Sequence, residues 1–80
     1  MSDDRIRGTI AYQIYSDTLF GNYSQATPPI RVIVENGHVT LAGVTDTQGE
    51  RLKAESIARS VPGVFKVDNL LRLTSEIRRD

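Results

Sequence analysis

The side chains that could do acid–base chemistry are few in this 80-residue chain. His38 is the one histidine, and Glu35 stands three positions before it, on the other side of Asn36-Gly37. A tight turn at that dipeptide would set the two side chains opposite each other as an acid–base pair. The alternative is a solvent-exposed cross-strand pair that contributes roughly a few tenths of a kcal/mol. We favour the exposed pair, so this arrangement alone does not predict an enzyme.

The potential nucleophiles lack an activating neighbour in the sequence, and the potential metal ligands are not clustered. Ser56 and Ser60 have no histidine nearby that could activate a hydroxyl group. Asp3 and Asp4 stand where a helix is expected to begin, a position that favours carboxylates electrostatically. The chain contains no cysteine, which excludes disulfides, thiolate nucleophiles and thiolate metal ligands. We therefore expect no catalytic residue, no metal and no cofactor.

The glycines have expected roles in the backbone rather than in ligand binding. Gly37 suits a turn position that needs a positive φ angle. Gly43 should face Ile30 on the inner side of a hairpin, where a missing side chain lets a helix approach. Pro62 and Gly63 are expected to end a helix. A phosphate-binding loop would need glycines clustered between a strand and a helix, and these are dispersed.

Residues 2–18 predict the first helix. Ser2 can cap its start, and the isoleucines Ile6, Ile10 and Ile14 recur every four positions as an apolar stripe. Residues 19–29, rich in glycine, proline and small polar side chains, predict a loop.

Residues 30–44 predict a β-hairpin with a type I′ turn at Asn36-Gly37. With this turn, paired residues have numbers that sum to 73, and one face of the hairpin is fully apolar. The pairs on that face are Val34 with Val39, Val32 with Leu41, and Ile30 with Gly43.

Residues 47–60 predict a second helix, because Thr47 and Glu50 fit a capping box. Residues 64–73 predict a third strand. Asn69 falls on its inner face, where a buried amide should bond to backbone groups, although a ligand contact is the alternative. The apolar side chains expected on the same face are Phe65, Val67, Leu71 and Leu73.

These elements predict one α+β domain over residues 1–80, in the order α-β-β-α-β. A three-stranded mixed sheet should have both helices packed on one face. The core should span residues 3–73, and residues 74–80 should form a polar tail or linker stub. The ten basic and ten acidic residues cancel and no basic tract appears, so nucleic acid is not an expected partner. No apolar run approaches the roughly 20 residues that a membrane span needs.

Four segments together resemble the BON domain family. They are residues 30–44, 54–58, 61–64 and 67–71, and the resemblance extends over residues 3–73. It implies the fold above and a non-enzymatic module of bacterial envelope or stress-related proteins. It also implies attachment to phospholipid membranes or envelope proteins in the periplasm or cell envelope, with a role in osmotic stress. The polar start of the chain is no signal peptide, so an exported protein would carry a leader that this sequence lacks.

The first helix carries a candidate binding surface opposite its isoleucine stripe. Tyrosines suit a membrane interface because their rings are apolar and their hydroxyl groups are polar. The alternative is that these aromatic residues pack beneath the following loop. The surface comprises Arg5, Tyr12, Tyr15, Leu19, Phe20 and Tyr23.

The uncovered face of the sheet is a second candidate surface. Mixed apolar and basic side chains there could dock an envelope protein or another domain, or support weak self-association. The alternative is an ordinary half-solvated sheet face. The residues expected on it include Arg31, Ile33, Thr40, Leu70 and Arg72.

Overall fold

Two helices and a three-stranded sheet form the body of the protein. The computed structural model describes residues 2–17 and 30–77. The predicted order α-β-β-α-β is confirmed, and one further helical turn follows it, where a polar tail had been predicted. The elements are α1 (Asp3–Ser16), β1 (Ile30–Glu35), β2 (His38–Thr45), α2 (Gln48–Ser60), β3 (Lys66–Leu73) and α3 (Thr74–Ile77).

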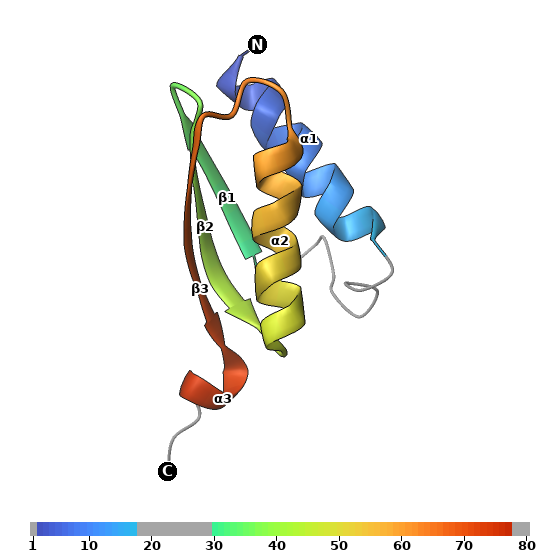
Figure 1. Ribbon diagram of the computed structural model, residues 1–80, viewed down its shortest axis with the longest axis vertical. Helices are drawn as coiled ribbons and strands as arrows, with labels where there is room; N and C mark the ends of the chain where they lie inside the picture. The colour runs from blue at the N-terminus through green and yellow to red at the C-terminus, as the bar shows by residue number, and fades with distance from the viewer. Residues whose placement is uncertain (1, 18–29, 78–80) are drawn as a thin grey trace.

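The sheet is mixed and has the strand order β1-β2-β3. β1 and β2 pair antiparallel, and the pairs Ile30–Gly43 and Val34–Val39 confirm the predicted register. β2 and β3 pair parallel, with α2 as the crossover between them. Both α1 and α2 cover the same face of the sheet, as Figure 1 shows, so neither of these two helices covers the other face.

The hairpin turns at Asn36 and Gly37, whose φ angles are 53° and 80°. Positive values at both positions are the requirement of a type I′ turn. Asparagine and glycine tolerate this left-handed backbone better than other residues do. The turn therefore fixes which face of β1 and β2 meets the helices.

Within residues 2–17 and 30–77, the core is one cluster between the sheet and the two helices. The isoleucine stripe of α1 is fully buried in it, as the four-residue spacing predicted. Ala54 and Ala58 of α2 are also buried, and their small side chains let this helix lie close to β2 and β3. The other buried apolar residues are Ile30, Val39, Leu41, Ile57, Val61 and Leu71.

Both predicted helix starts are capped by side chains. The Ser2 hydroxyl accepts a hydrogen bond from the Arg5 amide at 3.3 Å. At α2, the Glu50 amide donates to Thr47 Oγ1, and the Thr47 amide donates back to Glu50 Oε1, both at 3.1 Å. This reciprocal pair is the capping box, and it satisfies two amides that the helix cannot satisfy itself.

Phe65 corrects the prediction for the third strand. It was expected on the inner face, but β3 begins at Lys66 and the Phe65 side chain is 73% exposed. Gly63, with a φ angle of 96°, turns the α2–β3 connection toward the tip of the hairpin. The Phe65 amide donates there to the Gly37 carbonyl oxygen at 3.1 Å. Phe65 therefore belongs to the connection, and the inner face of the strand starts with Val67.

Candidate functional site

His38 pairs with a different carboxylate from the one the sequence suggested. Its Nε2 atom lies 2.8 Å from Oδ2 of Asp68 on β3, whereas Glu35 is its partner in the backbone register only. The hairpin places Glu35 and His38 opposite each other, but the carboxylate within hydrogen-bonding distance of the His38 ring is that of Asp68 on the parallel neighbour β3. Both the His38 and Asp68 side chains are more than a third exposed, so the pair is a solvated tie between β2 and β3.

Residues 2–17 and 30–77 contain no group of three or more His, Cys, Asp or Glu side chains that could hold a metal ion. Among the same residues, no helix has the length and apolarity needed to cross a bilayer.

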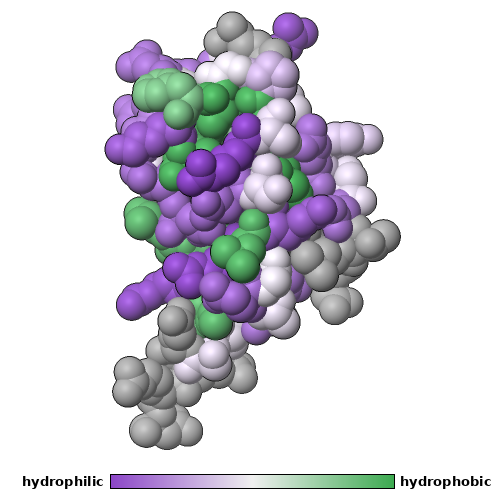
Figure 2. Space-filling model, in the orientation of Figure 1, coloured by the Kyte–Doolittle hydropathy of each residue, from purple (hydrophilic) through white to green (hydrophobic). Residues whose placement is uncertain are grey.

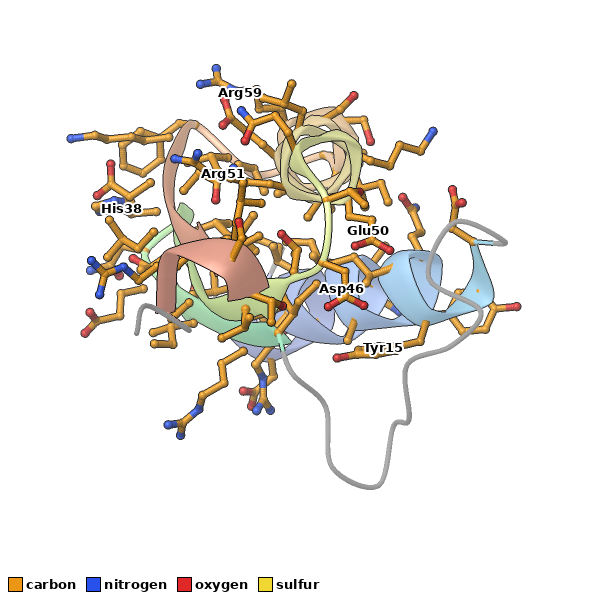
Figure 3. All side chains as sticks on the ribbon, turned by 90° about the horizontal axis from the view of Figure 1, so that it is seen from below. Tyr15, His38, Asp46, Glu50, Arg51 and Arg59 are labelled. Carbon is orange, nitrogen blue, oxygen red and sulfur yellow. The ribbon has the colours of Figure 1, made fainter. Side chains whose placement is uncertain are left out.

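The candidate surface on α1 divides into an exposed part and a covered part. Tyr12 is 70% exposed, and Arg5 is exposed on the same side of the helix. Tyr15 instead packs against the core, and its hydroxyl lies 3.4 Å from both the amide nitrogen and the carbonyl oxygen of Ile30. Figure 3 shows Tyr15 directed from α1 toward the start of β1. The expectation that Tyr15 points away from the core is therefore wrong.

Burial controls the chemistry of the Tyr15 hydroxyl. Desolvation raises the pKa of Tyr15 above its ordinary value, and the hydrogen bond with Ile30 opposes this only in part. The neutral hydroxyl is thus the form that the fold favours. The remaining members of the predicted surface, Leu19, Phe20 and Tyr23, lie outside the described residues.

A groove of about 790 Å³ runs between α1 and β1. Its floor is the edge of the sheet, and its wall is the side of α1 that carries Tyr12. The groove combines apolar strand side chains with two arginines and one aspartate, so it has both apolar and ionic character. Its lining residues are Asp4, Arg7, Gly8, Ala11, Tyr12, Tyr15, Ile30, Arg31, Val32, Ile33 and Val34.

The residues predicted for the second candidate surface lie together on the uncovered face of the sheet. Ile33 is 45% exposed and Leu70 is 61% exposed, and both lie on the side opposite the helices. In the register of the sheet, Ile33 pairs with Thr40, whereas Arg31, Ala42 and Leu70 form the next row. Arg72 follows on β3, beside Val44 of β2. The structure thus brings together the residues predicted there: Arg31, Ile33, Thr40, Leu70 and Arg72.

Exposed apolar side chains on the α2 side of the molecule are more scattered. Figure 2 shows separate hydrophobic patches on a largely hydrophilic surface rather than one continuous apolar area. Leu52 of α2 is 55% exposed and lies outside the groove between α1 and β1. Scattered single apolar side chains are normal on soluble surfaces and need no binding partner.

Asn69 has the structural role that its place on the inner face of the third strand predicted. Its Nδ2 atom donates to the Arg51 carbonyl oxygen at 3.0 Å and to Glu55 Oε1 at 3.1 Å. Its Oδ1 atom accepts from the Leu71 amide at 3.1 Å. The hydrogen bond from Asn69, aided by the nearby Arg59, lowers the pKa of Glu55. Asn69 therefore ties β3 to α2.

The hairpin tip is a meeting point that sequence reasoning missed. The Asp3 carboxylate accepts from the Asn36 amide at 2.8 Å and from the Gly37 amide at 3.2 Å. The α2–β3 connection touches the same turn through Phe65, whose ring lies 6.5 Å from that of His38. A type I′ turn leaves the amides of its two central residues without a partner in the hairpin, so the sequence indicated that an acceptor could bind there. No local pattern identified Asp3 as that acceptor.

These features define a class of protein: a small α+β module with helices on one face, an open sheet on the other and a groove along one edge. The comparison with protein families narrows the class. The family model of the BON domain matches residues 2–75, nearly the whole chain, and the chain belongs to the BON domain family. Domains of this family are generally non-catalytic binding modules associated with bacterial envelope and stress-related proteins. Among curated proteins, no sequence matches this chain.

Proposed function

We propose that this domain is a non-catalytic module that attaches a bacterial envelope or stress-related protein to a phospholipid surface. We place the module in the periplasm or cell envelope, where it would support resistance to osmotic stress. The exposure of Tyr12 is the observation that carries the proposal. A tyrosine in this position can insert its ring among lipid chains and keep its hydroxyl at the headgroups.

Charges near Tyr12 favour contact with anionic headgroups. Arg5 is exposed, and Arg31 lines the groove beside the helix. Arg7 forms an ion pair with Asp4 at 3.4 Å, but both side chains are largely exposed, so the pair is weak. Each basic group near an anionic membrane contributes roughly 1 kcal/mol or less, and salt screens it. Binding should therefore be modest and sensitive to salt.

The core permits this use of α1. The stripe of Ile6, Ile10 and Ile14 holds the helix on the sheet from the opposite side. Membrane contact through Tyr12 would consequently leave the core in place. A helix that lies in the interface buries its apolar side by roughly 5–10 Å, which a side chain as exposed as Tyr12 can reach without unfolding.

Vesicle flotation tests the proposal. The protein is mixed with phosphatidylglycerol-containing or pure phosphatidylcholine vesicles, at about 0.01 M and about 0.15 M salt. We expect co-flotation with the anionic vesicles at low salt and several-fold less after Tyr12→Ser. Leu52→Ser is the matched control, because Leu52 is an exposed apolar residue on the other helix. Absence of co-flotation, or an equal loss with Leu52→Ser, would refute membrane attachment through α1.

The open sheet face supports a second candidate function, namely docking of an envelope protein or of another domain. Ile33 and Leu70 are exposed there, with Arg31 and Arg72 beside them. Sedimentation at increasing concentration tests self-association through this face. We expect any dimer to weaken when Ile33→Thr and Leu70→Thr are combined, and a dimer that persists unchanged would point to another surface.

A further inference from the structure

The outer edge of β1 presents backbone hydrogen-bonding groups. Beside a two-residue turn, Glu35 and His38 form the first hydrogen-bonded pair, and such pairs then alternate along the strands. The backbone groups of Arg31 and Ile33 therefore point toward β2, whereas those of Val32 and Val34 point away from the sheet. The Ile30 backbone, two residues further along, also faces outward, and there it meets the Tyr15 hydroxyl.

At both ends of the outer edge of β1, the backbone groups already have hydrogen-bond partners. Tyr15 occupies the amide and carbonyl of Ile30, and Asp3 occupies the amides of the turn. Between them, the outward N–H and C=O groups of Val32 and Val34 have no hydrogen-bond partner within residues 2–17 and 30–77. An exposed strand edge of this kind is a template for pairing with another chain.

The groove between α1 and β1 provides space next to these free groups. Gly8 and Ala11 line its wall, and a side-chain carbon built at Gly8 would meet no atom within 4 Å. A strand added to β1 would direct every second side chain into this space beneath α1. The groove therefore suits an extended chain with apolar side chains at alternate positions.

We propose that β1 binds an extended segment of a partner protein, which adds to the sheet as an antiparallel fourth strand. Its backbone would pair with the free groups of Val32 and Val34. This site differs from a lipid-binding surface in what it recognises, because it binds the backbone N–H and C=O groups of an extended peptide. It needs no change in the core, since the edge and the groove already exist in the structure.

The side chains of β1 also specify the sequence of the segment. Arg31 and Glu35 are exposed on either side of Ile33, and neither has an ion pair among the described residues. Directly opposed side chains of opposite charge stabilise an antiparallel pair. Read from its N-terminus, the segment should therefore carry a basic residue, three apolar residues and an acidic residue.

A second copy of the domain fits this edge poorly. A two-fold axis that pairs two β1 strands would place both copies of α1 on the same face of the joined sheet. The two β1 strands would lie about 4.8 Å apart, but packed helices need about 8–10 Å between their axes. Because α1 packs over β1, the two helices would collide. A bare peptide segment has no such helix.

The probe is a capped peptide that contains Lys-Val-Ile-Val-Asp, titrated into isotope-labelled protein and followed by NMR. We expect the amide signals of Val32 and Val34 to shift and their hydrogen exchange to slow. A peptide N-methylated at its two valines loses the donors that face β1 and should bind at least about tenfold more weakly. Equal binding of the two peptides, or exchange at Val32 and Val34 that stays unchanged, would overturn the proposal.

Two sets of variants locate the site. Gly8→Leu fills the groove and should abolish peptide binding, whereas the matched control Gly8→Ala should bind normally. Arg31→Glu combined with Glu35→Arg should reverse the preference from the probe to Asp-Val-Ile-Val-Lys. Normal binding by Gly8→Leu, an unchanged charge preference, or protection of Val32 and Val34 by self-association without peptide would each rule out the proposed segment.

Discussion

Gly37 lies at a point where segments distant in the sequence meet. Its amide is bound by Asp3 and its carbonyl oxygen by Phe65. A side-chain carbon at this position would lie 2.7 Å from the Gly63 carbonyl oxygen, and its φ angle of 80° already disfavours any side chain. The turn thus allows no other residue for two independent reasons, backbone conformation and lack of space.

A substitution at Gly37 should therefore be costly. Gly37→Val should lower the free energy of unfolding by at least about 2 kcal/mol, measured by urea denaturation. Gly8→Ala is the control, because nothing crowds that position, and it should raise stability by up to about 1 kcal/mol. Unchanged stability of Gly37→Val would contradict the type I′ turn.

Asp3 should matter more than its neighbour Asp4. Asp3→Ala removes an acceptor from two amides of the turn and should cost about 1–2 kcal/mol in a thermal or urea melt. Asp4→Ala removes one exposed pair with Arg7 and should change stability by less than about 0.5 kcal/mol. Equal effects would mean that both carboxylates act only on the α1 dipole.

Glu55 gives the stability a defined dependence on pH. Its pKa in the folded protein is lower than the ordinary value of 4.5, mainly because of the hydrogen bond from Asn69. The stabilisation is therefore present above that ordinary value and is lost as the pH falls through the lowered pKa. We measure the free energy of unfolding by urea denaturation between about pH 7 and pH 3 and expect it to fall less steeply with decreasing pH in Asn69→Ala than in the unchanged protein. Parallel curves for the two proteins would contradict the assignment.

At the scale of elements, α1 separates binding from folding. Tyr12→Ser should leave the thermal melt unchanged, whereas Tyr15→Ser should cost about 1–3 kcal/mol through lost burial and hydrogen bonding. Ile10→Ser should unfold the domain, because a core deletion costs about 2–5 kcal/mol against a total of about 5 kcal/mol. If Tyr12→Ser destabilises as much as Tyr15→Ser, Tyr12 is part of the packed structure.

The elements themselves were predictable because their signals are local. The Asn36-Gly37 turn, with alternation on either side, set the hairpin register, and the Thr47–Glu50 pair set the start of α2. Tertiary contacts were not predictable in this way. Phe65 fits the strand pattern but lies in a connection drawn to the hairpin tip, and Tyr15 turns toward Ile30 because β1 passes beside the end of α1.

At the scale of the whole molecule, the candidate surfaces face different directions. The helices lie on one side of the sheet, and the face with Ile33 and Leu70 lies on the other (Figure 1). The β1 edge lies between these two sides. A domain that touches a membrane through α1 would therefore keep its sheet face available to a protein partner. Sequence alone predicted both faces, but the groove depends on how α1 sits over β1, which no local pattern contains.

The link between α3 and the end of β2 has a mechanical consequence. Thr74 Oγ1 donates toward the Thr45 carbonyl oxygen at 3.2 Å and toward Asp46 Oδ1 at 2.8 Å, which fastens the end of β3 to β2. The start of α1 and the α3 turn lie at opposite ends of the long axis (Figure 1). Tension between those ends would load the β2–β3 ladder in shear, so that its hydrogen bonds share the force. If α1, held mainly by side-chain packing, detached, the load would pass to Ile30 at the start of β1, which lies in the same row of the sheet as Leu71 near the end of β3. The strands would then be pulled apart from that end, one hydrogen bond after another, so the sheet resists tension only while α1 stays packed on it.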